Sequence, residues 1–205
     1  MKKPVLITLG SHCGLTHTLQ RLGLKGPSGP FDWVRAVNLN DVCDTVEKMA
    51  EDVELVKVGE GYYQNNCYLL GTEIRTAHYT LDKYPEIFKR RAERFLEDVR
   101  SDNHLVFIRC DLNECHSSTE TIERLKSALI KINPNVDYSL IVITEHTGSP
   151  DAASTLRNVN HQIWYNGTLK LWSDMSVDYI NEWFTIFTDL KLDPVISTEK
   201  PTDLV

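Results

Sequence analysis

Near its N-terminus the sequence reads Val5-Leu6-Ile7-Thr8-Leu9-Gly10-Ser11-His12-Cys13. The apolar run over Val5–Leu9 is typical of a short strand that is buried on both faces, as in a parallel sheet. Gly10 begins a turn, and beyond it leucines recur at helical spacing as far as Gly23, a residue type that often ends helices. This order of strand, turn and helix predicts an α/β protein whose first turn carries Cys13.

The alternation of strands and helices continues along the chain. Short apolar or alternating runs predict further strands at Val53–Val58, Leu105–Ile108, Leu140–Ile143 and Gln162–Tyr165, and a hairpin over Leu70–Thr76. Helical periodicity predicts helices from Asn40, as the cap, to Glu51, from Leu81 to Val99, from the capping box Ser117-Ser118-Thr119-Glu120 to Ile132, and from Val177 to Leu190. Strands that alternate with helices pair in parallel through right-handed crossovers, so we expect a three-layer α/β sandwich with a mostly parallel sheet. No repeat or linker interrupts the pattern, and residues 1–205 are expected to form a single domain.

Composition limits the classes of function. The 205 residues are 41% hydrophobic and 25% charged, which is typical of a globular protein. The net charge of -7 argues against binding to duplex nucleic acid, because such proteins neutralise phosphates with surplus Lys and Arg.

No apolar run approaches the roughly 18 residues that span a membrane. The first apolar run is too short for a signal peptide, and five irregularly spaced cysteines do not suggest a disulfide framework, so we expect a cytoplasmic protein. The oligomeric state is left open.

Cys13 is the strongest candidate for a catalytic residue. In a parallel sheet, ligands bind at the carboxyl ends of the strands, and Cys13 lies just beyond the end of the first one. The free N–H groups and the dipole of the following helix favour a thiolate there, which predicts a pKa below the ordinary thiol value. Ser11, His12 and Gly14 flank the sulfur and are expected to contact a substrate, and the helix N–H groups could form an oxyanion hole. The alternative is that Cys13 is a small buried hydrophobic residue, as most free cysteines are.

A nucleophilic cysteine needs a base, which is usually a histidine. His17 would lie one helical turn from Cys13 on the same face. His146 follows a predicted buried strand, so it should lie at the same edge of the sheet as Cys13, and spacing favours it. His78 is not placed by periodicity. His104 precedes its strand and should lie at the opposite edge.

Other polar residues are expected near the edge that carries Cys13. Arg109 and Asp111 follow a buried strand, and the guanidinium of Arg109 suits a substrate carboxylate or phosphate. The alternative is an ion pair of Arg109 with Asp32 or Asp111 that ties loops together. Asp32 and Trp33 follow a loop rich in Gly and Pro, and they are expected either to line a pocket or to plug the edge of the core, with Asp32 bonded to backbone.

Two further patterns have a simpler interpretation. Cys110, Cys115 and His116 resemble part of a zinc site, but structural zinc takes four ligands at closer, repeated spacing, so no metal is expected. The basic cluster over Lys89–Arg94 suits phosphates or an acidic partner, although a solvated helix face is the commoner case. No motif implies a cofactor.

Four motifs occur in order over the first half of the chain. They are Ile7-Thr8-Leu9-Gly10-Ser11-His12-Cys13 with Leu19-Gln20-Arg21-Leu22-Gly23-Leu24, then Pro30-Phe31-Asp32-Trp33, then Thr76-Ala77-His78 ahead of a basic helix, then Val106-Phe107-Ile108-Arg109. Together they resemble a bacterial and viral family of papain-like cysteine peptidases, over roughly residues 5–110.

The resemblance implies a cysteine–histidine pair in which Cys13 is the nucleophile and His78, rather than His146, is the base. Two positions depart from the family pattern. His12 stands where the family usually has Asn, and Tyr79 stands where it tends to have an acid that would orient the imidazole. The opening strand–turn–helix fits the papain-like label poorly and is more similar to the nucleophile turn of serine esterases.

We therefore expect a cysteine hydrolase of the peptidase or acyl-transfer type, whose substrate is a small molecule, a glycan or a peptide. Two alternatives stay open. One is a non-catalytic binding module for a phosphorylated or nucleotide-sugar ligand, with an anion site near Ser11 and Arg109. The other is a glycan-modifying enzyme in which Cys13 is only part of the pocket wall.

Overall fold

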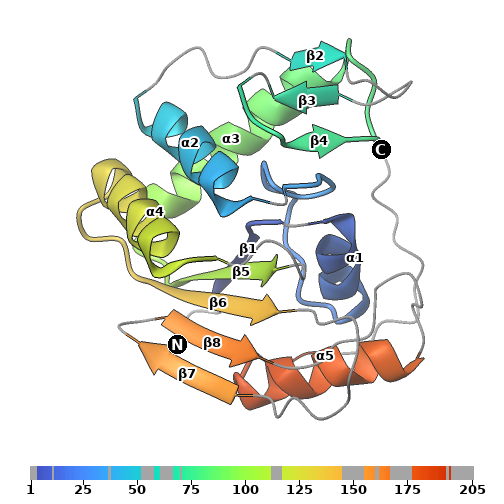
Figure 1. The fold of residues 1–205 in the computed structure, drawn as a ribbon, viewed down its shortest axis with the longest axis vertical. Helices are drawn as coiled ribbons and strands as arrows, with labels where there is room; N and C mark the ends of the chain where they lie inside the picture. The colour runs from blue at the N-terminus through green and yellow to red at the C-terminus, as the bar shows by residue number, and fades with distance from the viewer. Residues whose placement is uncertain are drawn as a thin grey trace.

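The structure is a computed structural model that describes residues 4–10, 12–36, 38–51, 58–60, 67–69, 71–111, 117–144, 155–159, 162–166, 177–192 and 194. Its larger sheet runs across the middle and lower part of the molecule in Figure 1. The strands of this sheet lie in the order β1 (Val5–Thr8), β5 (Leu105–Asp111), β6 (Tyr138–Thr144), β8 (Gln162–Asn166) and β7 (Thr155–Val159).

The larger sheet is mostly parallel, which confirms the predicted fold class. β1, β5, β6 and β8 pair in parallel, with Thr8 opposite Ile108 and Ile108 opposite Ile141. The carboxyl ends of these strands therefore meet at one edge. β7 pairs antiparallel with β8 and was not predicted, because the sequence before β8 carries no clear apolar period. β1 lies at the end of the described sheet, next to β5 alone.

Helices cover both faces of this sheet and make three layers (Figure 1). Alternate side chains of a strand point to opposite faces. Phe107 and Leu140 join the core beneath α2, α3 and α4, whereas Ile108 and Ile141 join a second core beneath α1 and α5. The bounds of the helices are α1 (Cys13–Arg21), α2 (Leu39–Ala50), α3 (Tyr84–Arg100), α4 (Thr119–Ile132) and α5 (Val177–Asp189).

A small antiparallel sheet lies beside α3 at the top of Figure 1. Its strands are β2 (Val58–Glu60), β3 (Cys67–Leu69) and β4 (Arg75–Thr76). The expected hairpin near 70–76 is therefore present, with its first strand slightly earlier in the chain. The strand expected at Val53–Val58 lies outside the described residues except for Val58, which begins β2.

Three predicted boundaries need correction. α2 is capped by Asn38, whose side chain accepts the N–H of Asn40, so Asn40 is already inside the helix. α4 is capped by Ser118, whose hydroxyl accepts the N–H of Thr121, so the cap lies one residue later than expected. β5 continues to Asp111 because Arg109 and Asp111, although charged, are fully buried in the strand.

Within the described part of the chain, no helix combines the length and the apolar character needed to cross a bilayer.

Candidate active site

Cys13 is the first residue of α1, and His12 caps that helix. The backbone of His12 is extended, with φ -144° and ψ 165°, and its Nδ1 atom accepts the N–H of Gly14 at 3.0 Å. Asn is a favoured cap because its side-chain oxygen accepts such an N–H. The imidazole of His12 does the same here with a ring nitrogen. Although His12 replaces the Asn that the family usually has, the helix is still capped, and Cys13 stays at its N-terminus.

Burial controls the acidity of the Cys13 thiol. The side chain is half-buried, and burial raises the pKa of Cys13 above the ordinary thiol value, although the N–H groups of Cys13 and Gly14 act in the opposite direction. The prediction of a lowered pKa was therefore wrong. Two backbone donors do not compensate for the solvation that a thiolate loses in this position. The resting group is a neutral thiol, which needs a base before it can attack.

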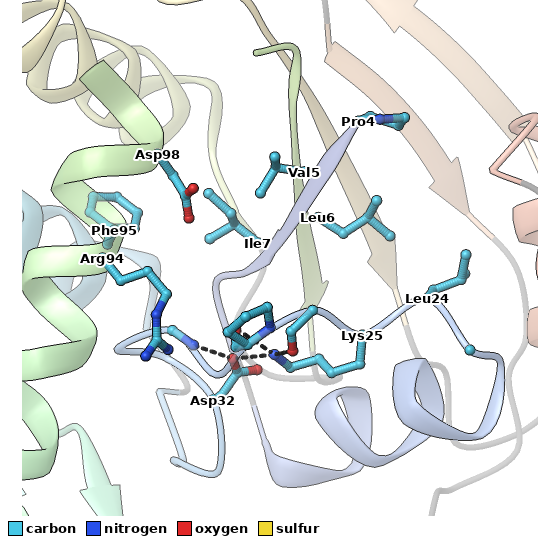
Figure 2. Close-up of a pocket in the computed structure, with 14 residues that line it drawn as sticks. Pro4, Val5, Leu6, Ile7, Leu24, Lys25, Asp32, Arg94, Phe95 and Asp98 are labelled. Carbon is cyan, nitrogen blue, oxygen red and sulfur yellow. Dashed lines mark hydrogen bonds and ion pairs between the residues drawn. The ribbon is translucent and has the colours of Figure 1, made fainter. Parts of the chain in front are cut away.

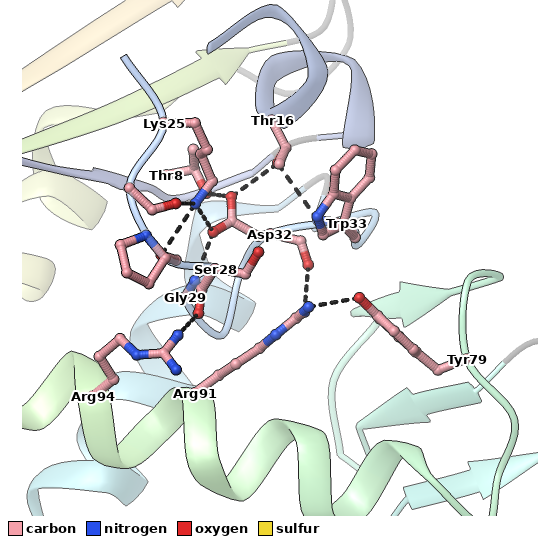
Figure 3. Close-up of polar contacts among 12 residues, drawn as sticks. Thr8, Thr16, Lys25, Ser28, Gly29, Asp32, Trp33, Tyr79, Arg91 and Arg94 are labelled. Carbon is pink, nitrogen blue, oxygen red and sulfur yellow. Dashed lines mark hydrogen bonds and ion pairs between the residues drawn. The ribbon is translucent and has the colours of Figure 1, made fainter. Parts of the chain in front are cut away.

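Asp32 is the centre of a buried polar network beside α1 (Figure 3). It is 1% exposed. One carboxylate oxygen accepts the hydroxyls of Thr8 at 2.7 Å and Thr16 at 2.9 Å, and the other accepts the N–H of Gly29 at 2.6 Å and pairs with Lys25 Nζ at 2.9 Å. A carboxylate with four such partners ties β1, α1 and the following loop together. Asp32 therefore holds these segments together, and it also lines the cavity described below.

Trp33 connects the segment of Cys13 with the segment of His78. Its backbone N–H lies 3.5 Å from the hydroxyl of Thr16, one turn after Cys13, and its carbonyl accepts the hydroxyl of Thr76 at 2.9 Å. Its φ of 62° lies in the left-handed region, which is unusual for a bulky side chain and costs about 1–3 kcal/mol. Residues in such strained conformations cluster at functional sites. The indole ring is 5% exposed.

His78 lies just after β4 with its ring against Trp33. The ring centroids are 5.4 Å apart at 67°, an edge-to-face contact, and the His78 N–H lies 3.2 Å from the hydroxyl of Thr76. The residue is exposed to solvent. Partial burial and the nearby guanidinium of Arg91 lower the pKa of His78 below its ordinary value. A neutral imidazole at neutral pH is the form that accepts a proton.

His17 and His146 are the other two candidates for the base. His17 is half-buried on α1, and burial, with a smaller contribution from Arg21, lowers its pKa. His146 and Ser11 lie outside the described residues. Among the residues that the structure describes, no hydrogen bond joins the Cys13 thiol to an imidazole.

The basic helix of the family motif holds the loop that carries Trp33 (Figure 3). Arg91 donates to the backbone carbonyl of Asp32 at 3.1 Å and to the hydroxyl of Tyr79 at 2.5 Å, and Arg94 donates to the carbonyl of Ser28 at 2.5 Å. Arg91 is 6% exposed. The interpretation of the whole basic cluster as a solvated face was therefore wrong for these two arginines, because α3 supplies the donors for the carbonyls of Ser28 and Asp32.

Arg109 braces the sheet from within the core. It is fully buried, its Nε donates to Asp111 at 2.9 Å, and its Nη1 donates to the carbonyls of Leu9 and Ala36, both at 2.7 Å. Asp111 in turn accepts the N–H and the hydroxyl of Ser117. The ion pair that was the alternative for Arg109 is the one observed, with Asp111 as the partner. It fixes the chain just before the turn to Cys13.

A cavity of about 340 Å³ lies along the outer edge of β1, between α3 and the loop after α1 (Figure 2). Cys13 and His78 are not among the residues that line it. Asp32 belongs both to this lining and to the polar network beside α1. Its lining consists of Pro4, Val5, Leu6, Ile7, Gly23, Leu24, Lys25, Gly26, Pro27, Gly29, Asp32, Arg94, Phe95 and Asp98.

The described residues hold no group of three or more His, Cys, Asp or Glu side chains that could bind a metal ion. Cys115 and His116 of the rejected zinc pattern lie outside them.

Sequence reasoning missed the residues that position the site. Thr16 was not singled out, and Thr76 was noted only as part of the motif ahead of His78, because a buried hydroxyl in an apolar pattern carries no period of its own. Arg91 had a usable signal, since it lies at helical spacing between Phe88 and Phe95 and therefore on the buried face of α3.

Comparison with known proteins shows the family of the chain. The family model described as "Putative papain-like cysteine peptidase (DUF1796)" matches residues 4–148. The uncharacterized protein R408 of Acanthamoeba polyphaga mimivirus is similar to this chain, at 26% identity over 173 residues that cover 67% of this chain and 77% of the viral protein. No solved structure matches the chain. The matched region includes Cys13, Trp33, His78 and Arg109, and the chain belongs to this family of papain-like cysteine peptidases.

Proposed function

We propose that the protein is a cysteine hydrolase in which Cys13 is the nucleophile and His78 is the base. The observation that carries the proposal is the double attachment of Trp33. Its backbone contacts Thr16 on the helix of Cys13 and Thr76 on the strand before His78, and its ring contacts His78 itself. An isolated bridge between Arg35 and Arg75 also pairs the chain just after Trp33 with β4, the strand that precedes His78.

The directions of the two pKa shifts define the chemistry. A raised pKa keeps the Cys13 thiol protonated, and a lowered pKa keeps the His78 imidazole neutral. The pair therefore rests as thiol and imidazole rather than as thiolate and imidazolium. His78 takes the thiol proton as the sulfur attacks a carbonyl, and the hydrogen bond between the two side chains forms when the substrate binds, since catalytic hydrogen bonds are often long in the free enzyme.

The remaining steps follow from acyl transfer. The N–H of Cys13, which already favours negative charge on the sulfur, stabilises the oxyanion, while the N–H of Gly14 stays with the capping ring of His12. The imidazolium of His78 returns the proton to the leaving group, and water then hydrolyses the thioester. The substrate is a small molecule, a glycan or a peptide that presents an ester, thioester or amide carbonyl.

Capture of the acyl-enzyme tests this proposal. We expect a panel of activated esters and peptide thioesters to leave an acyl adduct on Cys13, detected by mass spectrometry after acid quench. Cys13→Ala should abolish the adduct. Cys43→Ala is the matched control and should change nothing, because Cys43 is fully buried and its pKa is raised by burial to about 12. Absence of an adduct at Cys13 across the panel would contradict the hydrolase proposal.

The raised pKa of Cys13 also favours a second candidate, a binding module or glycan-modifying enzyme in which this cysteine only lines the pocket. Such a protein binds its phosphorylated or nucleotide-sugar ligand equally well after Cys13→Ala. The donors of Arg109 that contact Leu9, Ala36 and Asp111 are already used, so an anion would be held by other groups. Retained ligand binding together with no acyl adduct would favour this candidate.

A further inference from the structure

A second group of nucleophile, base and acid lies at the opposite edge of the larger sheet. His104 precedes β5, Asp137 precedes β6, and Ser139 is the second residue of β6. His104 Nδ1 is 3.0 Å from Asp137 Oδ2, and His104 Nε2 is 3.2 Å from Ser139 Oγ. Carboxylate, imidazole and hydroxyl are thus connected in the order that serine hydrolases use.

The connection sets the roles of the two ring nitrogens. A proton on Nδ1 of His104 is directed at the carboxylate of Asp137, which leaves Nε2 as the acceptor for the hydroxyl of Ser139. In this tautomer the imidazole is ready to take the hydroxyl proton. Asp137 then stabilises the imidazolium that forms.

The backbone holds these three residues in place. The carbonyl of His104 accepts the N–H of Val5 at 3.0 Å, the carbonyl of Asp137 accepts the N–H of Leu105 at 2.9 Å, and Ser139 lies opposite Val106 in the parallel ladder. Sites on strands keep their geometry better than sites on loops. Ser139 therefore sits on β6, and backbone bonds to the sheet fix His104 and Asp137 where the chain enters β5 and β6.

Solvent reaches this group. The side chain of His104 is 39% exposed and that of Asp137 is 66% exposed, while Ser139 is half-buried. By contrast, the hydroxyl of Ser127 donates to the carbonyl of Glu123, and no hydrogen bond joins it to an imidazole among the residues that the structure describes. Reagents from solution can therefore reach a serine that has a base, and the chain offers a serine without one for comparison.

We propose that Ser139 is a second nucleophile, which accepts acyl groups from small ester substrates with His104 as its base and Asp137 as the residue that orients the base. Ser139 Oγ bonds to the ester carbonyl carbon, and its proton passes to His104 Nε2. The bond from that carbon to the alcohol oxygen then breaks, and the alcohol leaves with the proton from His104. Water hydrolyses the acyl-serine by the same route. The site is independent of Cys13.

The test uses the full chain with Cys13→Ala, so that the thiol cannot compete. A fluorophosphonate probe should label Ser139, mapped by peptide mass spectrometry, at least about tenfold faster than Ser127. His104→Gln and Asp137→Asn should each slow this labelling by about tenfold or more, with unchanged thermal unfolding, whereas Ser127→Ala should have no effect. Labelling of Ser139 no faster than that of Ser127, or unaffected by His104→Gln, would overturn the proposal and leave the group as a structural tie between β5 and β6.

Discussion

At the position of Cys13, two effects act on one thiol in opposite directions. The start of α1 offers N–H groups to the sulfur, which favours the thiolate. Burial removes water from the same sulfur, which favours the neutral thiol, and this effect is the larger one. The sequence shows where the helix begins but not how much of the side chain is covered. Position alone therefore predicts the wrong direction for the pKa of this residue.

The pH dependence of alkylation follows from that direction. We expect the rate of Cys13 alkylation by iodoacetamide to rise with pH through a midpoint above the ordinary thiol value of about 8.5, because only the thiolate reacts and the raised pKa delays its formation. Mass spectrometry of each cysteine peptide measures the rate, and Cys43 is the slow internal reference. A midpoint below about 8.5 would show that the helix N-terminus outweighs burial after all.

The buried Arg109–Asp111 pair predicts a large effect on stability. Arg109→Leu leaves the carboxylate of Asp111 in the core without its cation, and we expect a loss of about 3–5 kcal/mol in the free energy of unfolding. Urea unfolding at neutral pH measures this loss. The matched control is Arg124→Leu. The side chain of Arg124 is 35% exposed and pairs with Asp44 and Glu47, so this substitution should lower the free energy of unfolding by about 0–1 kcal/mol.

A double variant tests whether the unpaired carboxylate of Asp111 causes the loss of stability in Arg109→Leu. In the double variant Arg109→Leu, Asp111→Leu no charge is left unpaired, so part of the lost stability should return. A double variant that is less stable than Arg109→Leu would show that the carbonyls of Leu9 and Ala36, rather than the carboxylate, need the guanidinium most.

At the scale of elements, the start of α1 depends on an unusual cap. We expect His12→Asn to keep the stability of the protein, because Asn presents an acceptor to the N–H of Gly14, and His12→Ala to cost about 0.5–2 kcal/mol. Thermal and urea unfolding of the two variants measure the difference. Equal destabilisation by both substitutions would mean that His12 contributes through packing of its ring and not through the cap.

The elements also explain which sequence predictions succeeded. β1, α1, α3, β5, α4 and β6 follow from apolar runs and helical periods, since each element buries one clear face or both. Caps were predicted less well, because several polar residues compete for the same helix end, as Asn38 and Asn40 do. The sequence of β7 has no apolar period, and this strand is recognised only by its antiparallel pairing with β8. The sequence alone therefore could not identify it.

At the scale of the whole molecule, contacts between residues that are far apart in the chain determine how the segments of the site are held together. Cys13 could be chosen from its place after β1, and the motif resemblance added His78. What the sequence could not indicate is that Asp32, Trp33 and Arg91 hold these segments together, since the contact between Arg91 and Asp32 joins residues that are far apart in the chain. The contacts of Arg109 were hidden for the same reason, because nothing local shows that its donors are used by Leu9 and Ala36.

The most direct test of the central claim is the rate at which p-nitrophenyl acetate acylates Cys13 at pH 7, measured by intact-protein mass spectrometry in the wild type and in His78→Gln and His17→Gln. At this pH the thiol is neutral, so attack requires a base, and general-base assistance contributes about 10²–10⁴-fold. The account predicts that His78→Gln slows acylation by at least about tenfold and that His17→Gln leaves the rate close to that of the wild type. An unchanged rate in His78→Gln, or a loss found only in His17→Gln, would contradict it.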